Sequence, residues 1–297
     1  MAEQPRLAGI LSVLVTPLKE DETIDVLAYR ALIRRVLDAG VHGVVVLGSA
    51  GEFAALRDTA KREAIAAAVK EVSGQVPVIV GTGEPGTRRA IEMTQAAKSL
   101  GADAALVVPP FYYRVDREGL LRHYRAVADE GGLPIMLYDI PAFTKTPLPV
   151  DVVAELAEEP NIVGIKDSTG NLRNFQALTA QARSETFTVV TGSDAMLLFE
   201  LMSDGDGAVS PGSNIVPGWF VALWDAFHAD RLDAASDWQS RIAAMHRGIG
   251  YGAFPAGIKG ALKALGIGNG RLAAPGVGVT DKQLVAIRGW LGEHGVC

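Results

Sequence analysis

Lys166 is the residue whose type and position point most directly to chemistry. It closes an uncharged, mostly β-branched run over residues 161–165, and the turn sequence Asp167-Ser168-Thr169-Gly170 follows it. This pattern predicts a buried parallel strand with a lysine at its carboxyl end. Strand residues alternate sides, so we expect Asp167 to point away from the face that carries Lys166. A lysine kept from water and counter-ions can attack a ketone as the neutral amine, whereas the alternative is a side chain that extends into solvent.

Eight short apolar runs alternate with windows of helical spacing, and these elements must position the lysine. We expect strands at residues 10–16, 43–48, 77–81, 104–108, 134–138, 162–166, 187–191 and 207–210. Helices are expected at residues 25–39, 58–72 and 171–182, with Asp58 and Asn171 as N-caps. Strands that alternate with helices in this way favour an α/β fold, the (β/α)8 TIM barrel, over an open doubly wound sheet.

After the eighth strand the helical pattern continues further than one barrel unit requires. Windows with helical spacing cover residues 216–229, 233–245, 256–265 and 280–294, and a glycine-rich stretch covers residues 266–279. We therefore expect a catalytic barrel over residues 1–230 and a C-terminal helical extension over residues 231–297.

The carboxyl ends of the other predicted strands add reactive groups to the same rim of such a barrel. Ser49 lies between two glycines after the second strand, and Tyr112 and Tyr113 follow the fourth. Tyr138 ends the fifth strand with the parity of Met136, so it is expected to face the barrel interior. Together these groups suit imine chemistry, in which an amine condenses with a ketone, a phenol moves protons and backbone amides bind a carboxylate.

A second motif favours a different function. The segment from Gly81 to Gly86 (GTGEPG) follows a strand, opens a helix and fits the G-x-G-x-x-G pattern of dinucleotide sites, with Asp103 downstream as a candidate ribose ligand. However, Asp103 precedes its strand, and this turn belongs to the third β/α unit instead of the first. We expect no bound cofactor, and an NAD(P)-dependent oxidoreductase stays an alternative of another class.

Composition excludes several other classes. The chain of 297 residues has a net charge of −6 and no basic stripe that would favour nucleic acid or an anionic membrane surface. Its only cysteine is Cys297, and none of its five histidines ends a predicted strand beside a second ligand, so no metal site is expected. No signal peptide or membrane helix is expected, and we predict a cytoplasmic protein.

Three segments together resemble the family of pyruvate-dependent class I aldolases: Gly48-Ser49-Ala50-Gly51-Glu52, Tyr138-Asp139-Ile140-Pro141 and Gly164-Ile165-Lys166-Asp167. This family includes dihydrodipicolinate synthase (4-hydroxy-tetrahydrodipicolinate synthase), N-acetylneuraminate lyase and 2-keto-3-deoxygluconate aldolase. The resemblance runs from about Gly9 to about Pro217 and is looser in the C-terminal helices. It implies an enzyme without a cofactor that is usually a homotetramer, built as a dimer of dimers.

The resemblance also implies roles for individual residues. Lys166 is similar to the lysine that forms the Schiff base with pyruvate, and Tyr138 to the phenol that shuttles protons. Ser49 matches the hydroxyl between that tyrosine and a second one, which in this family reaches into the neighbouring subunit's site. Tyr112 is the best match for the second tyrosine, with Tyr113 as the alternative. The residues implied to line the pyruvate pocket are Ala50, whose amide and that of Ser49 would hold the carboxylate, Gly192 and Val209.

Departures from the family pattern bear on the substrate. Dihydrodipicolinate synthases normally carry an arginine for the second substrate's carboxylate where this chain has Phe143, and a second threonine where it has Ala50. A phenylalanine cannot imitate a bidentate guanidinium contact. The segments around residues 191–194 and 212–214 are similar to 2-keto-3-deoxy sugar-acid aldolases, in which Thr144, Asp194 and Ser213 would bind sugar hydroxyls.

We therefore expect a lyase that reversibly cleaves a 2-keto-3-deoxy sugar acid, or a related 4-hydroxy-2-oxo acid, into pyruvate and an aldehyde. The same scaffold leaves 4-hydroxy-tetrahydrodipicolinate synthase and N-acetylneuraminate lyase activities open. A barrel that binds a keto acid without turnover is the non-catalytic alternative.

Overall fold

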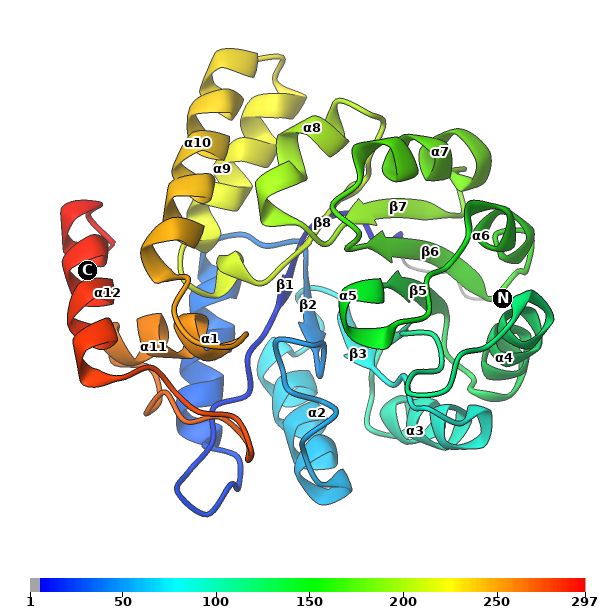
Figure 1. Cartoon of the computed structure of the whole chain (residues 1–297), viewed down its shortest axis with the longest axis horizontal. Coiled ribbons are helices and arrows are strands. Elements are labelled where there is room, and N and C mark those ends of the chain that lie inside the picture. Colours follow the sequence, from blue (N-terminus) through cyan, green and yellow to red (C-terminus); the bar gives the residue numbers. More distant parts are fainter. Residues whose placement is uncertain (1–5, 297) are drawn as a thin grey trace. The chain divides into compact units, whose positions relative to one another are not determined.

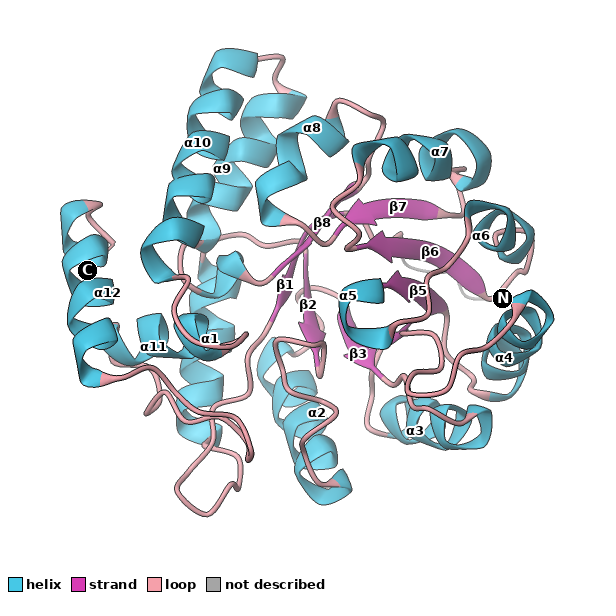
Figure 2. Cartoon of the chain, viewed as in Figure 1, coloured by secondary structure: helices cyan, strands magenta, loops and turns pink. Residues whose placement is uncertain are grey.

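The computed structural model describes residues 6–296, and its eight strands close into one parallel barrel in the order β1 to β8. This confirms the predicted fold class. The strands are β1 (Gly9–Val13), β2 (Gly43–Val46), β3 (Val78–Gly81), β4 (Ala104–Val107), β5 (Ile135–Asp139), β6 (Ile162–Asp167), β7 (Thr188–Thr191) and β8 (Gly207–Ser210). Figure 2 shows how strands and helices alternate.

The helices between and after the strands follow the predicted pattern. They are α1 (Val26–Asp38), α2 (Asp58–Val72), α3 (Thr87–Ser99), α4 (Arg117–Glu130), α5 (Pro141–Thr144), α6 (Val150–Leu156), α7 (Leu172–Ala182), α8 (Leu197–Leu201), α9 (Pro217–His228), α10 (Leu232–Ile249), α11 (Ala256–Ala264) and α12 (Asp281–Glu293), with short 3-10 turns η1 (Asp194–Met196) and η2 (Gly212–Asn214). None of the helices within residues 6–296 is both long and apolar enough to cross a membrane.

The chain divides into two compact units. The first comprises the described residues up to Leu11, with His42–Val45 and Val76–Val209. The second comprises Ser12–Val41, Val46–Gln75 and the described residues from Ser210 onward. Helices α10 to α12 form the expected C-terminal extension, but the boundary between residues 230 and 231 stays a prediction.

In the first unit, strands β3 to β7 are buried along their whole length, and α3, α4, α6 and α7 lie outside them (Figure 1). Strand β5 pairs with β6 in a register that sets Tyr138 beside Lys166 and Asp139 beside Asp167. The ladder shifts once: Ile135 pairs with Ile162 and Met136 with Gly164, so Val163 is an extra residue. The Asn171 side chain accepts from the amides of Arg173 and Asn174, which confirms this predicted N-cap.

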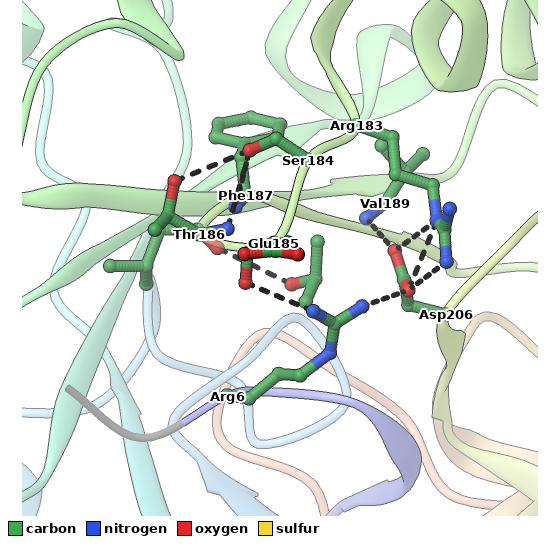
Figure 3. Close-up of polar contacts among 10 residues, drawn as sticks. Arg6, Arg183, Ser184, Glu185, Thr186, Phe187, Val189 and Asp206 are labelled. Atoms are coloured by element: carbon green, nitrogen blue, oxygen red, sulfur yellow. Dashed lines mark hydrogen bonds and ion pairs between the residues drawn. The ribbon is translucent and has the colours of Figure 1, made fainter. Parts of the chain in front are cut away.

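A cluster of charges holds the amino ends of β7 and β8 in the same unit (Figure 3). The buried Asp206 carboxylate accepts two hydrogen bonds of 3.1 Å from Arg183 Nε, one of 2.7 Å from Arg6 Nη2 and one of 2.9 Å from the Val189 amide. Every partner of this carboxylate is a donor, so its negative charge is compensated inside the protein.

In the second unit, α1 and α12 begin with side-chain N-caps, whereas the cap predicted for α2 is wrong. The Asp25 side chain accepts from the Ala28 amide, and Thr280 forms a capping box with Gln283 at the start of α12. Asp58 was predicted as the N-cap of α2, but Arg57 occupies that position and Asp58 is the first helical residue. Its carboxylate still lies at the positive end of the helix dipole, which explains why the sequence signal resembled a cap.

Candidate active site

Lys166 and Tyr138 form a buried pair at the carboxyl ends of neighbouring strands. Both residues are 3% exposed, and Lys166 Nζ lies 4.1 Å from the centroid of the Tyr138 ring. This contact is in the range of a cation–π interaction, which attracts an ammonium without neutralising it. Among residues 6–296, Lys166 forms no ion pair with a carboxylate. The first unit therefore holds an amine and a phenol together, as the sequence predicted.

The acids next to this pair face other partners. Asp167 accepts from the Thr169 amide at 2.7 Å and from Asn174 Nδ2 at 3.0 Å, and Asp139 accepts from the Leu148 amide at 3.2 Å. Since residues along a strand alternate sides, Asp167 turns away from Lys166 as expected. The alternation thus separates the amine from the nearest negative charges along its own strand.

Gly192 makes room for Lys166. A Cβ atom at this position would lie 2.7 Å from Lys166 Cε and 1.8 Å from Ser168 Oγ, and the Gly192 amide donates to the Asp167 carbonyl at 2.6 Å. Any larger residue would have to displace the lysine side chain or Ser168. The implied position of Gly192 beside a pyruvate pocket stays a prediction.

Three buried carboxyl groups, Asp139, Asp167 and Glu200, form an acid cluster that sequence reasoning did not single out. Burial raises the pKa of the Asp139 carboxyl to about 7, and the negative charge of Asp167 acts in the same direction. Burial likewise raises the pKa of Glu200 to about 7, partly opposed by a hydrogen bond from Thr191. The signal was present in the sequence, because Asp139 and Asp167 directly follow the two reactive residues.

The residues after β5 are less suited to binding a ligand than the sequence suggested. The Thr144 hydroxyl is buried and lies 3.1 Å from the Ile140 carbonyl and 3.0 Å from the Thr146 carbonyl, so it serves the turn. Phe143 is 57% exposed and supplies no donor.

Asp194 is buried at the start of η1, and Val209 is fully buried in β8.

Tyr112 does not join the buried pair within its own chain. It is 86% exposed, has a left-handed φ of 79°, and packs edge-on against Tyr113 at 4.9 Å between ring centroids. A phenol ring held outward in this way is available to a second molecule. The exposure does not distinguish Tyr112 from Tyr113, which is exposed too.

The second unit carries the loop after β2 and with it Ser49 and Ala50. Two successive turns shape this loop: the Gly51 amide donates to the Gly48 carbonyl at 3.0 Å, and the Glu52 amide to the Ser49 carbonyl at 3.2 Å. Ala50 is buried, and Ser49 is partly exposed. The loop therefore folds back on itself at the two residues whose amides are implied to bind a carboxylate.

Ser213 was predicted to bind a sugar hydroxyl, and its surroundings do not support that role. Its hydroxyl is fully buried, 2.7 Å from the Ser210 carbonyl and 2.8 Å from the Ser12 hydroxyl. The neighbouring Asn214 side chain bonds in the same way to the backbone of Val13 and Val15. These bonds join η2 to the segment that contains the end of β1, and a role of Ser213 toward a sugar hydroxyl stays a prediction.

The glycine motif after β3 has a packing explanation. A Cβ atom at Gly83 would lie 2.5 Å from the Val108 side chain and 2.8 Å from the Val108 amide, so the backbone needs glycine there. The motif also belongs to a closed barrel with strands in sequence order, which lacks the reversal of strand order at which an open doubly wound sheet binds a dinucleotide. Within residues 6–296, no group of three or more His, Cys, Asp or Glu side chains could hold a metal ion.

Comparisons with known proteins agree with this geometry. The sequence model of the Dihydrodipicolinate synthetase family matches residues 6–291. A 4-hydroxy-tetrahydrodipicolinate synthase of Stenotrophomonas maltophilia (strain R551-3) is 41% identical over 263 residues, covering 89% of this chain and 88% of that protein. The synthase of Methanoculleus marisnigri is 36% identical over 289 residues, covering 97% and 99%.

Solved structures show the same relationship. The dihydrodipicolinate synthase of Thermotoga maritima superposes with a TM-score of 0.95 at 27% identity, covering 99% of this chain and 100% of that one. YagE, a prophage protein of the dihydrodipicolinic acid synthase family from E. coli K12 solved with pyruvate, superposes with a TM-score of 0.93 at 30% identity, covering 99% and 100%.

The barrel, the buried amine and these relatives define a pyruvate-dependent carbon–carbon lyase. The chain belongs to the dihydrodipicolinate synthetase family.

Proposed function

We propose that Lys166 binds pyruvate as an imine and that Tyr138 transfers protons to and from the bound substrate. The observation that carries this proposal is the buried pair, with Lys166 Nζ 4.1 Å from the centre of the Tyr138 ring and no carboxylate paired to the amine among residues 6–296. The lysine amine attacks the keto carbon and water leaves. The positive imine then lets the adjacent methyl carbon lose a proton, and the resulting enamine attacks an aldehyde. Tyr138 would donate the proton that the new alkoxide takes up.

The names of the relatives favour condensation as the direction of the reaction and a carboxylated aldehyde as the second substrate. Proteins 41% and 36% identical to this chain are 4-hydroxy-tetrahydrodipicolinate synthases. We therefore propose condensation of pyruvate with the carboxylated aldehyde of that synthase as the leading function. The family role of Ser49 as a relay hydroxyl, and of the Ser49 and Ala50 amides as carboxylate donors, is part of this proposal.

Phe143 supports a second candidate function, the cleavage of a 2-keto-3-deoxy sugar acid. Its exposed phenyl ring occupies the position where the synthases normally carry a carboxylate-binding arginine. Without a guanidinium, a second carboxylate loses a bidentate contact. An aldehyde whose polar groups are hydroxyls does not need that contact. The same chemistry then runs in reverse: Tyr138 accepts the proton of the C4 hydroxyl as the carbon–carbon bond breaks.

The exposed phenol of Tyr112 supports a third element of the proposal, assembly into a homotetramer of paired dimers. In such an assembly Tyr112 would complete the site of the partner subunit. Tyr112→Phe should lower turnover while leaving the oligomer intact, as measured by sedimentation velocity and initial rates. A wild-type chain that sediments as a monomer with full activity would contradict this element. A cytoplasmic location remains a prediction.

Trapping with borohydride tests the imine directly. Wild-type protein incubated with pyruvate and sodium borohydride should gain the mass of one reduced pyruvate adduct per chain, and peptide mapping should locate it at Lys166. Lys166→Ala should gain none, whereas Lys145→Ala, which removes an exposed lysine, should react like wild type. A folded wild-type protein that gains no adduct would indicate a barrel that binds a keto acid without imine chemistry.

A substrate comparison separates the two candidate functions. Formation of 4-hydroxy-tetrahydrodipicolinate from pyruvate and the synthase's aldehyde is measured beside release of pyruvate from 2-keto-3-deoxygluconate and from N-acetylneuraminate. The leading function requires the highest kcat/KM in the first reaction. If a sugar acid is the better substrate, Phe143→Arg should lower that activity and raise the synthase reaction. A synthase rate that Phe143→Arg leaves unchanged would show that this position does not select the aldehyde.

A further inference from the structure

A buried ion pair anchors the loop after β2 to a distant part of the chain in the second unit. The Glu52 carboxylate, at the end of this loop, contacts the Lys259 ammonium on α11, and the two side chains are only 6% and 3% exposed. Charges removed from water to this degree are costly unless they are paired and hydrogen-bonded.

Each partner of the ion pair makes a second bond to the segment that follows α11. Glu52 Oε2 accepts from the Ala273 amide at 2.8 Å, and Lys259 Nζ donates to the Arg271 carbonyl at 2.7 Å. Three segments thus meet at one buried point: the loop, the helix and the strap formed by residues 271–273. Lys259 is buried like Lys166, but its ammonium is engaged by a carboxylate, so the two lysines serve different purposes.

The loop itself has a backbone that requires support. Leu47 and Glu52, which flank it, have φ values of 58° and 59°, in the left-handed region that residues other than glycine rarely adopt. At Gly51 a Cβ atom would lie 3.0 Å from Leu47 Cα and 3.1 Å from the Leu14 carbonyl. The Thr16 hydroxyl also donates to the Gly51 carbonyl at 2.8 Å. Such a conformation persists only where its surroundings hold both ends.

We propose that Glu52 and Lys259 are a positioning pair that fixes the amides of Ser49 and Ala50 for the keto-acid carboxylate, so that the C-terminal helices determine the affinity for pyruvate. This rests on the proposed function, because it needs those amides to bind the carboxylate. A loop released from α11 would lose its carboxylate contacts, whereas the amine at Lys166 would keep its reactivity. The effect is therefore specific to ketones that carry a carboxylate.

The test compares two ketones on the full-length protein. Pyruvate carries a carboxylate and acetone does not, and both form imines that borohydride reduces. For Lys259→Met, the pyruvate concentration that gives half-maximal trapping at Lys166 should rise about tenfold, the effect of losing a charge-assisted contact. The trapping rate with acetone should stay as in wild type. Lys263→Met, one helical turn further along α11 and exposed, is the matched control and should change neither value.

If Lys259→Met does not fold, a second variant tests the same role. The double variant Glu52→Gln with Lys259→Met removes both charges, a change that buried pairs often tolerate. It should also raise the half-maximal pyruvate concentration, because residue 259 can no longer donate to the Arg271 carbonyl. A folded variant with an unchanged pyruvate value overturns the proposal. An equal loss for pyruvate and acetone overturns it too, since it shows general damage at Lys166. If wild-type protein traps neither ketone, the proposed function fails first and the positioning role fails with it.

Discussion

The two ends of the strands in the first unit differ in whether a buried charged group has partners of opposite charge. At the amino ends of β7 and β8, the Asp206 carboxylate is surrounded by donors from Arg6, Arg183 and a backbone amide. At the carboxyl ends of β5 and β6, the Lys166 amine faces an aromatic ring and has no carboxylate partner among residues 6–296. Complete compensation of charge favours stability, whereas incomplete compensation leaves a group free to react. From this difference we expect the amino ends of β7 and β8 to serve the fold and the carboxyl ends of β5 and β6 to serve chemistry.

The largest expected effect is the loss of turnover on removing the amine. Lys166→Met should lower kcat by a factor on the order of ten thousand, because no imine can form. Its free energy of unfolding should stay the same or increase, since an apolar side chain replaces a buried ammonium that lacks a carboxylate partner. Initial rates and urea denaturation measure the two quantities. A marked loss of stability would show that Lys166 is a structural residue, and the contrast between the two ends would disappear.

The next effect concerns the phenol. Tyr138→Phe keeps the ring under the amine but removes the hydroxyl, so kcat should fall about a hundredfold or more while borohydride still traps pyruvate. Single-turnover kinetics with trapping separate imine formation from the later steps. Unchanged kcat in this variant would assign the proton transfer to another group.

At the amino ends of β7 and β8, a substitution is expected to change stability alone. Asp206→Asn should lower the free energy of unfolding by about 2 kcal/mol, because hydrogen bonds to a charged buried group are lost and two arginines lose their partner. Asp151→Asn, at an exposed ion pair with Arg117, should cost less than about 1 kcal/mol and serves as the control. Urea denaturation with activity assays on the folded protein checks both. A drop in kcat for Asp206→Asn without unfolding would break the division of roles.

The smallest effect is a pH dependence from the acid cluster. Burial raises the pKa of Asp139 to about 7, whereas an unfolded chain releases this proton near pH 4. The folded protein binds the extra proton between these values, so the free energy of unfolding should decrease as pH rises from about 4 to about 7. Asp139→Asn should flatten this decrease in part, with Glu200 contributing the remainder. Denaturation at pH 5 and pH 8 measures the slope, and an identical slope in the variant would contradict the shift.

The fold and the reactive pair were accessible from the sequence because both follow from short-range patterns. Apolar runs gave all eight strands, and strand alternation set the sides on which Lys166, Asp167 and Tyr138 lie. The synthase function, which the sequence left open as an alternative, is favoured by the relatives. The expectation of a sugar-acid lyase rested on Phe143, on Ala50 and on the segments around residues 191–194 and 212–214.

The remaining features depend on pairs that are distant along the chain. No local pattern shows that Glu52 meets Lys259, or that Ser213 is already bonded to Ser12. A serine in a loop after a strand has the same sequence signature whether it binds a ligand or the backbone. The predicted N-cap of α2 was wrong for a different reason. An acid at the first helical residue and an acid at the N-cap give the same sequence signal, shifted by one position.

The irregularity at Val163 has a consequence for how the chain tolerates length changes. Because strand side chains alternate, the identity of the residue that faces inward at the end of β6 depends on an odd or even count from the start of the ladder. Val163 is the additional residue, and the regular pairing resumes with Gly164 opposite Met136. Deleting Val163 would therefore leave Lys166 beside Tyr138, whereas deleting Ile165, after the irregularity, would bring Asp167 opposite Tyr138 and put an acid where the amine lies. The consequence of a deletion thus depends on where it falls: the irregularity can absorb the loss of one residue, and the regular part of the strand cannot.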